Sequence, residues 1–167
     1  MFITSSRKPS AKTRTFCKKL SQFTTFRYVN RGKTGLRDLL DLAEGEAFLI
    51  VGEYHGNPGS LSFYGTEGKL SFSLRFSEIS SEKVSLGFSG KLKLFGRGEL
   101  AELLAFYLPF DRVEDVSALP AGFRVLIVEE NSLDFREGNT STLKLRPRSF
   151  KRYEESDNSD TLLEKSR

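Results

Sequence analysis

The chain has 167 residues, with 26 Lys and Arg against 22 Asp and Glu, and its formal net charge is +4. That length suits one domain, or two small halves that share a core, and 15 Phe residues supply much of the apolar surface that a core needs. A single Cys and a single His exclude an internal disulfide and a zinc site built from Cys and His, and no apolar run is long enough to span a membrane. The first residues also lack the apolar segment of a secretory signal. We therefore expect a soluble cytoplasmic protein with no metal, no other cofactor and no membrane partner.

Positive charge is concentrated at the start of the chain. Residues 1–37 hold ten Lys and Arg and no Asp or Glu, whereas the remainder holds 16 basic and 22 acidic residues. Like charges repel one another, so such a segment does not help folding and is typical of a protein that binds a polyanion. The alternative is a basic face that contacts only solvent, and composition does not separate the two.

The opening stretch begins with a strand and a helix. Residues 1–5 predict a short strand, and a helix follows from Ser10, a suitable N-cap, to about residue 23, because apolar side chains recur there at i, i+4 and i+7. Arg14 and Lys18 project from the opposite side of this helix. Cys17 lies at the edge of its apolar stripe, and we interpret it as a packing residue.

A second strand–loop–helix unit comes next. Residues 26–29 predict a strand, residues 30–35 a turn, and the spacing of Leu residues predicts a helix over 36–45. The continuous apolar run 47–51 predicts a strand buried on both faces, as in a parallel sheet with helical crossovers. Residues 55–59, HGNPG, predict a turn.

Shorter patterns fill the remainder of the chain. A helix is predicted for 98–108 and a buried strand for 123–128. Alternating apolar residues predict strands, expected to pair antiparallel, at 61–63, 70–76, 84–88, 132–136 and 142–145. Residues 154–167 are polar, and we expect a disordered tail there.

One pattern occurs twice. Residues 47–53, AFLIVGE, lead through a turn into SLSF at 60–63, and residues 124–130, RVLIVEE, lead into SLDF at 132–135. An amphipathic helix precedes each copy. We interpret the repeat as two similar α/β halves with mixed sheets packed by helices, forming one domain over 1–153 that divides near residue 90. The alternative is chance, since apolar strands resemble one another.

The two strand–loop–helix joints of the opening stretch are the candidate binding site. A helix N-terminus presents unpaired backbone N–H groups and the positive end of its dipole, which favour an anion. If the first three strands are parallel, both joints lie at the same carboxyl edge of the sheet, beside the 55–59 turn. Their hydroxyl groups and cations then form one phosphate-binding surface, here called the basic edge: Thr4, Ser5, Ser6, Arg7, Lys8 and Ser10 from the first joint, and Arg31, Lys33 and Thr34 from the second.

Catalytic interpretations fit these residues less well. Gly32-Lys33-Thr34 matches the end of a nucleotide-binding P-loop, but the first glycine of that motif would fall on Arg27, inside a predicted strand. Glu53 and His55 lie near a strand end and suit an acid–base pair, although such residues are more often solvated. We expect no catalytic residue. The alternative is an enzyme acting on a phosphorylated small molecule or nucleotide at the basic edge.

A second basic cluster lies near the end of the predicted domain. Its cations are interleaved with Phe150 and Tyr153: Lys144, Arg146, Arg148, Lys151 and Arg152. Aromatic rings that stack on unpaired bases, together with cations that meet phosphates, suit RNA. The alternative is an edge strand whose charges, with Pro147, prevent edge-to-edge aggregation.

Five short segments form an ordered set: Ile3–Ser10 (ITSSRKPS), Thr13-Arg14-x-Phe16, Asn30-Arg31-Gly32, Leu36-x-Asp38-Leu39 and Gly56-Asn57-Pro58-Gly59. Together they resemble the Brix-domain family, in particular its short archaeal members, and the resemblance extends to about residue 150. It implies two similar α/β halves akin to an anticodon-binding domain. It also implies a non-catalytic role in ribosome biogenesis through binding ribosomal RNA or its precursor.

By this resemblance, the RNA-facing positions are the Ser5–Ser10 segment, Arg14 and the Arg31-Gly32 turn. The chain lacks the long extensions of eukaryotic members, so their protein partners and nucleolar location do not carry over. We expect rRNA or pre-rRNA as the partner, with other ribosome assembly proteins as further partners; a protein-interaction scaffold with an acidic partner is another hypothesis. The residues expected to bind RNA are Ser5, Ser6, Arg7, Lys8, Ser10, Arg14, Lys18, Arg31, Lys33, Arg146, Arg148, Lys151 and Arg152.

Overall fold

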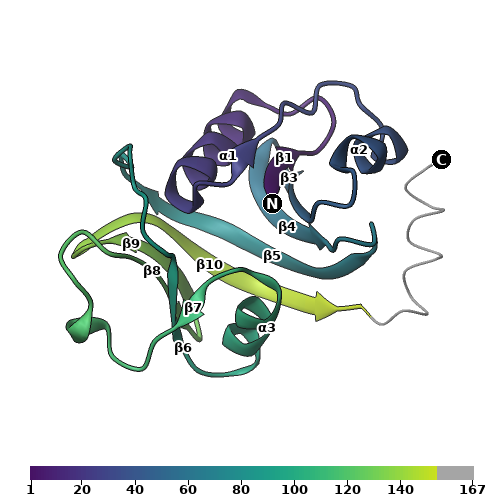
Figure 1. Cartoon of the computed structure of the whole chain (residues 1–167). Coiled ribbons are helices and arrows are strands. Elements are labelled where there is room, and N and C mark those ends of the chain that lie inside the picture. Colours follow the sequence, from purple (N-terminus) through teal and green to yellow (C-terminus); the bar gives the residue numbers. More distant parts are fainter. Residues whose placement is uncertain (154–167) are drawn as a thin grey trace. The chain divides into compact units, whose positions relative to one another are not determined.

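The computed structural model describes residues 1–153, so the tail predicted for 154–167 lies outside the described residues (Figure 1). The first half contains β1 (Phe2–Ser5), α1 (Ala11–Thr24), β2 (Arg27–Tyr28), α2 (Leu36–Ala43), β3 (Phe48–Tyr54), β4 (Asn57–Tyr64) and β5 (Leu70–Ser81). The second half contains β6 (Lys93–Gly96), α3 (Glu99–Tyr107), β7 (Asp111–Arg112), the 3-10 turn η1 (Val116–Ala118), β8 (Arg124–Glu129), β9 (Ser132–Glu137) and β10 (Thr140–Arg152). Within residues 1–153, no helix is both long enough and apolar enough to cross a bilayer.

The two halves have the same strand topology. In the first, β1 lies between β2 and β3 and is parallel to both, and β3, β4 and β5 then pair antiparallel. In the second, β6 lies between β7 and β8 and is parallel to both, and β8, β9 and β10 pair antiparallel. The prediction of two similar α/β halves with mixed sheets is therefore confirmed.

Strand register matches the sequence repeat residue by residue. Val51 of β3 pairs with Ser5 at the end of β1, and Val128 of β8 pairs with Gly96 at the end of β6. The repeat places the same two valines in equivalent positions of its two copies. The residues that follow Ser5 and those that follow Gly96 are thus equivalent joints, and they can be compared directly.

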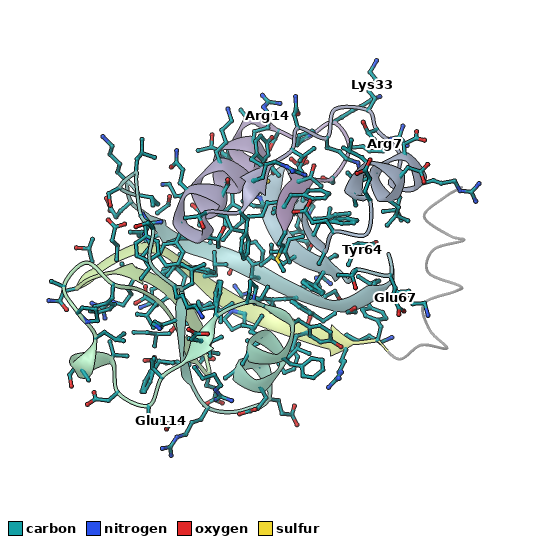
Figure 2. The ribbon with its side chains drawn as sticks, viewed as in Figure 1. Arg7, Arg14, Lys33, Tyr64, Glu67 and Glu114 are labelled. Carbon is teal, nitrogen blue, oxygen red and sulfur yellow. The ribbon has the colours of Figure 1, made fainter. Side chains whose placement is uncertain are left out.

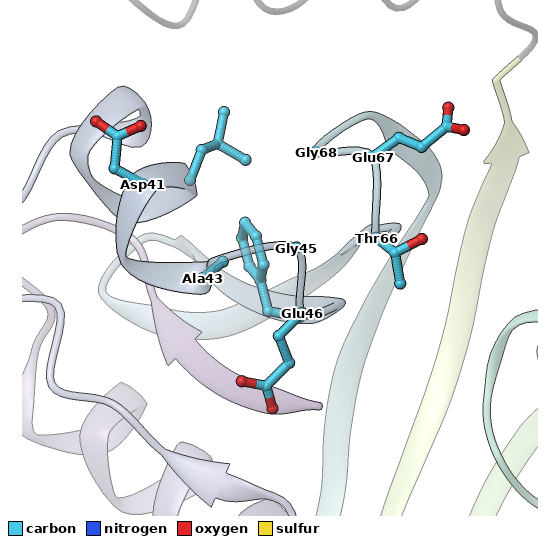
Figure 3. A pocket seen from close by; sticks show the side chains of 9 residues that line it. Asp41, Ala43, Gly45, Glu46, Thr66, Glu67 and Gly68 are labelled. Carbon is cyan, nitrogen blue, oxygen red and sulfur yellow. The ribbon is translucent and has the colours of Figure 1, made fainter.

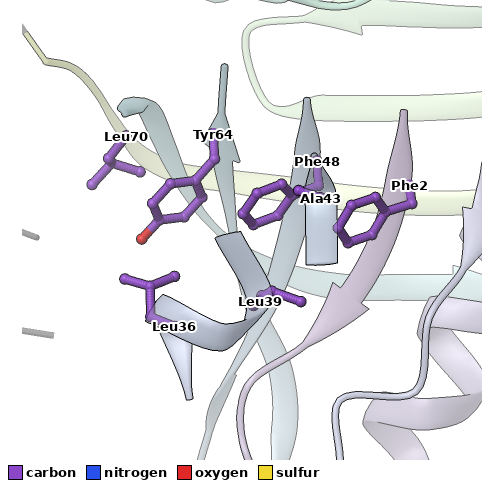
Figure 4. Close-up of a cluster of buried hydrophobic side chains, with 7 residues drawn as sticks. All are labelled: Phe2, Leu36, Leu39, Ala43, Phe48, Tyr64 and Leu70. Carbon is purple, nitrogen blue, oxygen red and sulfur yellow. The ribbon is translucent and has the colours of Figure 1, made fainter. Parts of the chain in front are cut away.

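In the first half, α2 packs against a row of aromatic rings on the sheet (Figure 4). The rings of Phe2 and Phe48 stack with centroids 4.9 Å apart, and those of Phe48 and Tyr64 with centroids 5.0 Å apart. Leu36 and Leu39 of α2 are buried against this row. Burying each side chain of this size stabilises the fold by roughly 1.5–3 kcal/mol. The row therefore holds α2, and with it the loop that leads into α2, against the sheet.

Packing groups the chain into two units. The first comprises Met1–Ser21, Phe26–Arg75 and the described residues from Ser149 to Tyr153, and the second comprises Gln22–Thr25 and Phe76–Arg148. Because β5 and β10 each contribute residues to both units, the sequence-based division near residue 90 stays a prediction.

The strand predicted for 84–88 is wrong, because this segment has no regular structure between β5 and β6. The side chain of Arg124 is only 1% exposed, and its guanidinium donates a hydrogen bond to the carbonyl oxygen of Ser85 in this segment. The centroid of the Phe88 ring lies 4.5 Å from the guanidinium carbon, whereas Leu86 is 79% exposed, so the apolar alternation does not mark one buried face. The partners of the guanidinium are the carbonyl oxygens of Gln22, Phe23 and Ser85, the carboxylate of Glu137 and the rings of Phe23 and Phe88.

Other differences concern element length. The predicted turn at 55–59 contains only His55 and Gly56, both with positive φ (51° and 76°), and β4 begins directly afterwards. β10 is far longer than the strand predicted for 142–145 and includes the second basic cluster. β6 and β7 were not predicted, because their short segments carry no clear alternation.

Candidate nucleic-acid interface

Direct hydrogen bonds join the two joints of the basic edge. β1 is parallel to β2 and β3, so the loops after β1 and β2 leave the same edge of the sheet, as the sequence predicted. The backbone N–H of Lys8 donates to the carbonyl oxygen of Gly32 at 3.0 Å. The Arg31 guanidinium donates to the carbonyl oxygens of Ser5 and Thr34 at 3.1 and 2.6 Å. The two loops therefore form one continuous surface of the first unit.

Arg31 itself does not present its charge as expected. Its side chain is 6% exposed, and burial lowers the pKa of the guanidinium. Its hydrogen bonds go to the backbone of both loops. Arg31 therefore supports the two loops of the basic edge, and its contact with RNA stays a prediction. Nothing in the local sequence Asn-Arg-Gly distinguishes a buried arginine from an exposed one.

The other candidate cations of the first unit are exposed: Arg7, Lys8, Arg14, Lys18 and Lys33. Figure 2 shows Arg7, Arg14 and Lys33 projecting from the part of the chain that contains α1 and α2. Arg14 also donates to the carbonyl oxygen of Pro9 at 2.9 Å, which ties the first turn of α1 to the loop before it. The basic edge thus combines buried supports with exposed charges.

The serines of the first joint mainly support the loop. Ser5 is fully buried and its hydroxyl donates to the carbonyl oxygen of Ser6, so this hydroxyl is not available to a ligand. Ser6 and Ser10 are half-buried. Lys8 adopts a φ of 50°, a left-handed conformation that lysine rarely takes and that its hydrogen bond to the second loop stabilises.

The N-terminus of α1 is already capped by a carboxylate of the protein. Glu53, near the end of β3, accepts a hydrogen bond from the Ser10 backbone N–H at 2.6 Å. Hydrogen bonds from Thr13 and then from Ser10 hold the pKa of Glu53 below its usual range. The positive end of this helix is therefore already paired with a carboxylate of the protein, while Arg7 and Lys8 beside it are exposed.

The hairpin turn between β3 and β4 is fastened to the same helix. The Ser10 hydroxyl donates to the carbonyl oxygen of Gly56 at 2.7 Å, and the Lys12 ammonium group lies 3.4 Å from the side-chain oxygen of Asn57. The turn predicted to lie beside the basic edge does so. It brings Tyr54, which the sequence analysis did not identify, to this edge together with His55.

The equivalent joint of the second half lacks this character. Gly96 is followed by Arg97 and Gly98, and α3 then begins at Glu99 with Glu102 in the same first turn. The Glu102 carboxylate lies 2.5 Å from a guanidinium nitrogen of Arg112. The two halves share a fold, but only the first carries a basic joint.

The second basic cluster lies on β10. Pairing with β9 extends from Thr140 to Leu145, so the cations that follow lie where β9 no longer pairs, beside Pro147. In the first unit, the Lys151 ammonium group lies 4.7 Å from the ring centroid of Tyr153. Arg146, Arg148, Lys151 and Arg152 are exposed, as is Phe150. The RNA-binding and edge-strand interpretations of this cluster both stay predictions.

The groups weighed for catalysis are engaged elsewhere. Cys17 is fully buried, and burial raises its pKa to about 12, which confirms the packing interpretation. Glu53 holds the N-terminus of α1. A pocket of about 250 Å³ in the first unit lies between α2 and the β4–β5 turn, and Asp41, Glu46 and Glu67 are among the residues that line it (Figure 3). The Glu46 carboxylate is paired with the N-terminal ammonium group at 2.7 Å and with Arg27 at 3.2 Å.

Comparisons with known proteins agree with this description, although no family model matches the chain. A Methanosarcina barkeri protein, named a probable Brix domain-containing ribosomal biogenesis protein, is 49% identical over 157 residues, covering 92% of this chain and all of that protein. A Methanothermobacter thermautotrophicus protein of the same name is 34% identical over 160 residues, covering 83% of this chain and 99% of that protein.

Solved structures share the fold. The crystal structure of Mil, an archaeal Imp4-like protein, superposes with a TM-score of 0.74 at 26% identity and covers 92% of this chain and all of that one. A probable ribosomal biogenesis protein from Aeropyrum pernix K1 gives a TM-score of 0.62 at 22% identity, which supports the fold alone.

Fold and site together define a protein of two similar α/β halves in which one half carries a strongly basic sheet edge. The chain belongs to the Brix-domain family of ribosome biogenesis proteins, as the resemblance of its short segments predicted.

Proposed function

We propose that this protein is an RNA-binding ribosome biogenesis factor that holds ribosomal RNA or its precursor through the basic edge, in the cytoplasm and without catalysing a reaction. The names of its relatives support the ribosome biogenesis part. The charge distribution supports RNA as the ligand, because a polyanion is the natural partner of a segment with ten cations and no carboxylate.

One observation carries the proposal: the hydrogen bonds that join the two loops. Lys8 N–H bonds to Gly32, and buried Arg31 bonds to both loops. The exposed cations Arg7, Lys8 and Lys33 are therefore held on one rigid surface instead of on separate mobile segments. Phosphate contacts made from a preorganised surface lose less conformational entropy on binding.

The test is crosslinking of the protein to RNA in cells, followed by sequencing of the bound RNA. Wild-type protein should enrich ribosomal RNA and its precursor over tRNA and mRNA. A variant with Arg7→Gln, Lys8→Gln and Lys33→Gln should lose most of this enrichment while remaining folded. Equal recovery of all RNA classes by the wild-type protein would refute the proposed ligand.

An enzymatic role gives a different result in a separate assay. If purified protein turned over nucleotides or phosphate esters, and Lys33→Gln abolished that turnover, the non-catalytic part of the proposal would be wrong. We expect no turnover, because the Glu53 carboxylate beside the basic edge is bound to the N-terminus of α1.

A further inference from the structure

Tyr54 is an aromatic side chain held open to solvent beside the basic edge. It is 61% exposed although it lies in β3, next to the two-residue turn that joins β3 to β4. The His55 ring meets it edge-on, with centroids 4.2 Å apart at 70°. The Arg75 guanidinium of β5 lies 5.7 Å from the Tyr54 centroid. Much of the ring therefore remains free for a further contact.

Hydrogen bonds to Ser10 hold the chain on both sides of Tyr54. The side-chain carboxylate of Glu53 accepts from the Ser10 backbone N–H, and the carbonyl oxygen of Gly56 accepts from the Ser10 hydroxyl. Gly59 lies so close that a Cβ added there would be 3.0 Å from the Cβ of Tyr54. An exposed ring fixed in this way differs from a surface aromatic that is merely tolerated.

The sheet beside Tyr54 leaves room for a planar ligand. Gly52, Ser60 and Arg75 pair in register across β3, β4 and β5, and residues paired in this way project from the same face. Gly52 and Ser60 are small, so the Arg75 guanidinium is the large group among these three residues. An aromatic ring with a neighbouring guanidinium is the chemistry that binds an unpaired nucleobase, by stacking and cation–π contact.

We propose that Tyr54, assisted by Arg75, is a stacking platform for one unpaired base of the RNA that the basic edge holds by its phosphates. This inference rests on the proposed function and adds single-stranded RNA, or an unpaired loop, as the form of RNA recognised at this point. The ring binds without regard to sequence, since every base has a π-face. Together, the edge and the platform recognise a backbone segment from which one base projects.

The test compares two RNA probes that carry the same number of phosphates, an unstructured oligouridine and a fully paired duplex. Tyr54→Ala should weaken binding of oligouridine roughly tenfold, the scale of one lost base stack, and leave duplex binding unchanged. Tyr54→Phe should bind both probes as the wild type does. Phe106→Ala, which removes a ring that is 69% exposed in α3, is the matched control and should change neither affinity.

A direct signal is available because the chain contains no Trp. The fluorescence of a Tyr54→Trp variant should be quenched by oligouridine and not by the duplex. If wild-type protein binds neither probe, the proposed function fails. If wild-type protein binds both probes but Tyr54→Ala matches it and the Tyr54→Trp signal does not change, the platform is refuted and the proposed function stands.

Discussion

At the N-terminus of α1, the Glu53 carboxylate takes the place of an external anion. Its pKa lies below the ordinary value of 4.5, so the folded state binds this proton less readily than the unfolded state. Its contribution to stability is therefore complete above pH 4.5 and is lost as the pH falls through the folded-state pKa.

We predict that Glu53→Gln lowers the free energy of unfolding at pH 7 by about 0.5–1 kcal/mol, the lower part of the range for a lost helix cap, because the side chain is exposed and screened. Urea unfolding of both proteins at several pH values checks this. The difference should shrink below pH 4.5, and a difference that stayed constant down to pH 3 would contradict the role of the charge.

Arg124 is the largest fully buried side chain among residues 1–153, and its guanidinium pairs with the Glu137 carboxylate of the second unit. Arg124→Met leaves three carbonyl oxygens and the Glu137 carboxylate without their donor, so we predict a loss of about 3–5 kcal/mol. Arg124→Lys should recover little, because an ammonium group cannot reach the same spread of acceptors. Denaturant midpoints at unchanged m-value measure both, and a loss under about 1 kcal/mol for Arg124→Met would show that the network is not structural.

At the scale of elements, two glycines differ in the atom that an added Cβ would meet. Gly96 ends β6 with a φ of +149°, and a Cβ there would fall against the carbonyl oxygen of Val128. Gly52 in β3 has ordinary φ, and a Cβ there would meet the Ser60 hydroxyl, which can rotate away. We predict that Gly96→Ala destabilises by about 2–3 kcal/mol and Gly52→Ala by less than about 1 kcal/mol. Thermal unfolding of the two variants checks this, and equal losses would contradict it.

Helices and buried strands were predictable because their patterns are local. Apolar spacing located α1, α2 and α3, and the repeated apolar run located β3 and β8. The short strands β6 and β7 were missed because they depend on parallel partners far along the chain. The segment predicted as a strand at 84–88 contacts the buried guanidinium of Arg124, which lies 39 residues from Ser85 in the sequence and gives no local signal.

At the scale of the whole molecule, sequence reasoning located the basic edge but not its internal organisation. The loops were expected together because parallel strands bring their carboxyl ends to one edge, and they are joined there. The burial of Arg31 and the capping by Glu53 depend on contacts between residues 26 and 43 apart in the sequence, which have no local signal. The exposure of Tyr54 has no local signal either. The first half carries the basic joint, and Glu99 and Glu102 occupy the counterpart in the second.

The central claim is that exposed cations of the basic edge hold RNA by its phosphates. Its most direct test is an RNA filter-binding titration over a range of salt concentrations, with wild-type protein and the Arg7→Gln, Lys8→Gln, Lys33→Gln variant. A control variant, Lys83→Gln, Lys91→Gln and Arg97→Gln, removes the same charge from exposed positions of the second unit.

The triple variant of the basic edge should bind RNA more weakly and lower the magnitude of the slope of log K against log salt by about 2, since each lost phosphate contact removes about 0.7–0.9. The control variant should keep nearly the wild-type slope. An unchanged slope for the basic-edge variant, or an equal decrease for the control, would contradict the account.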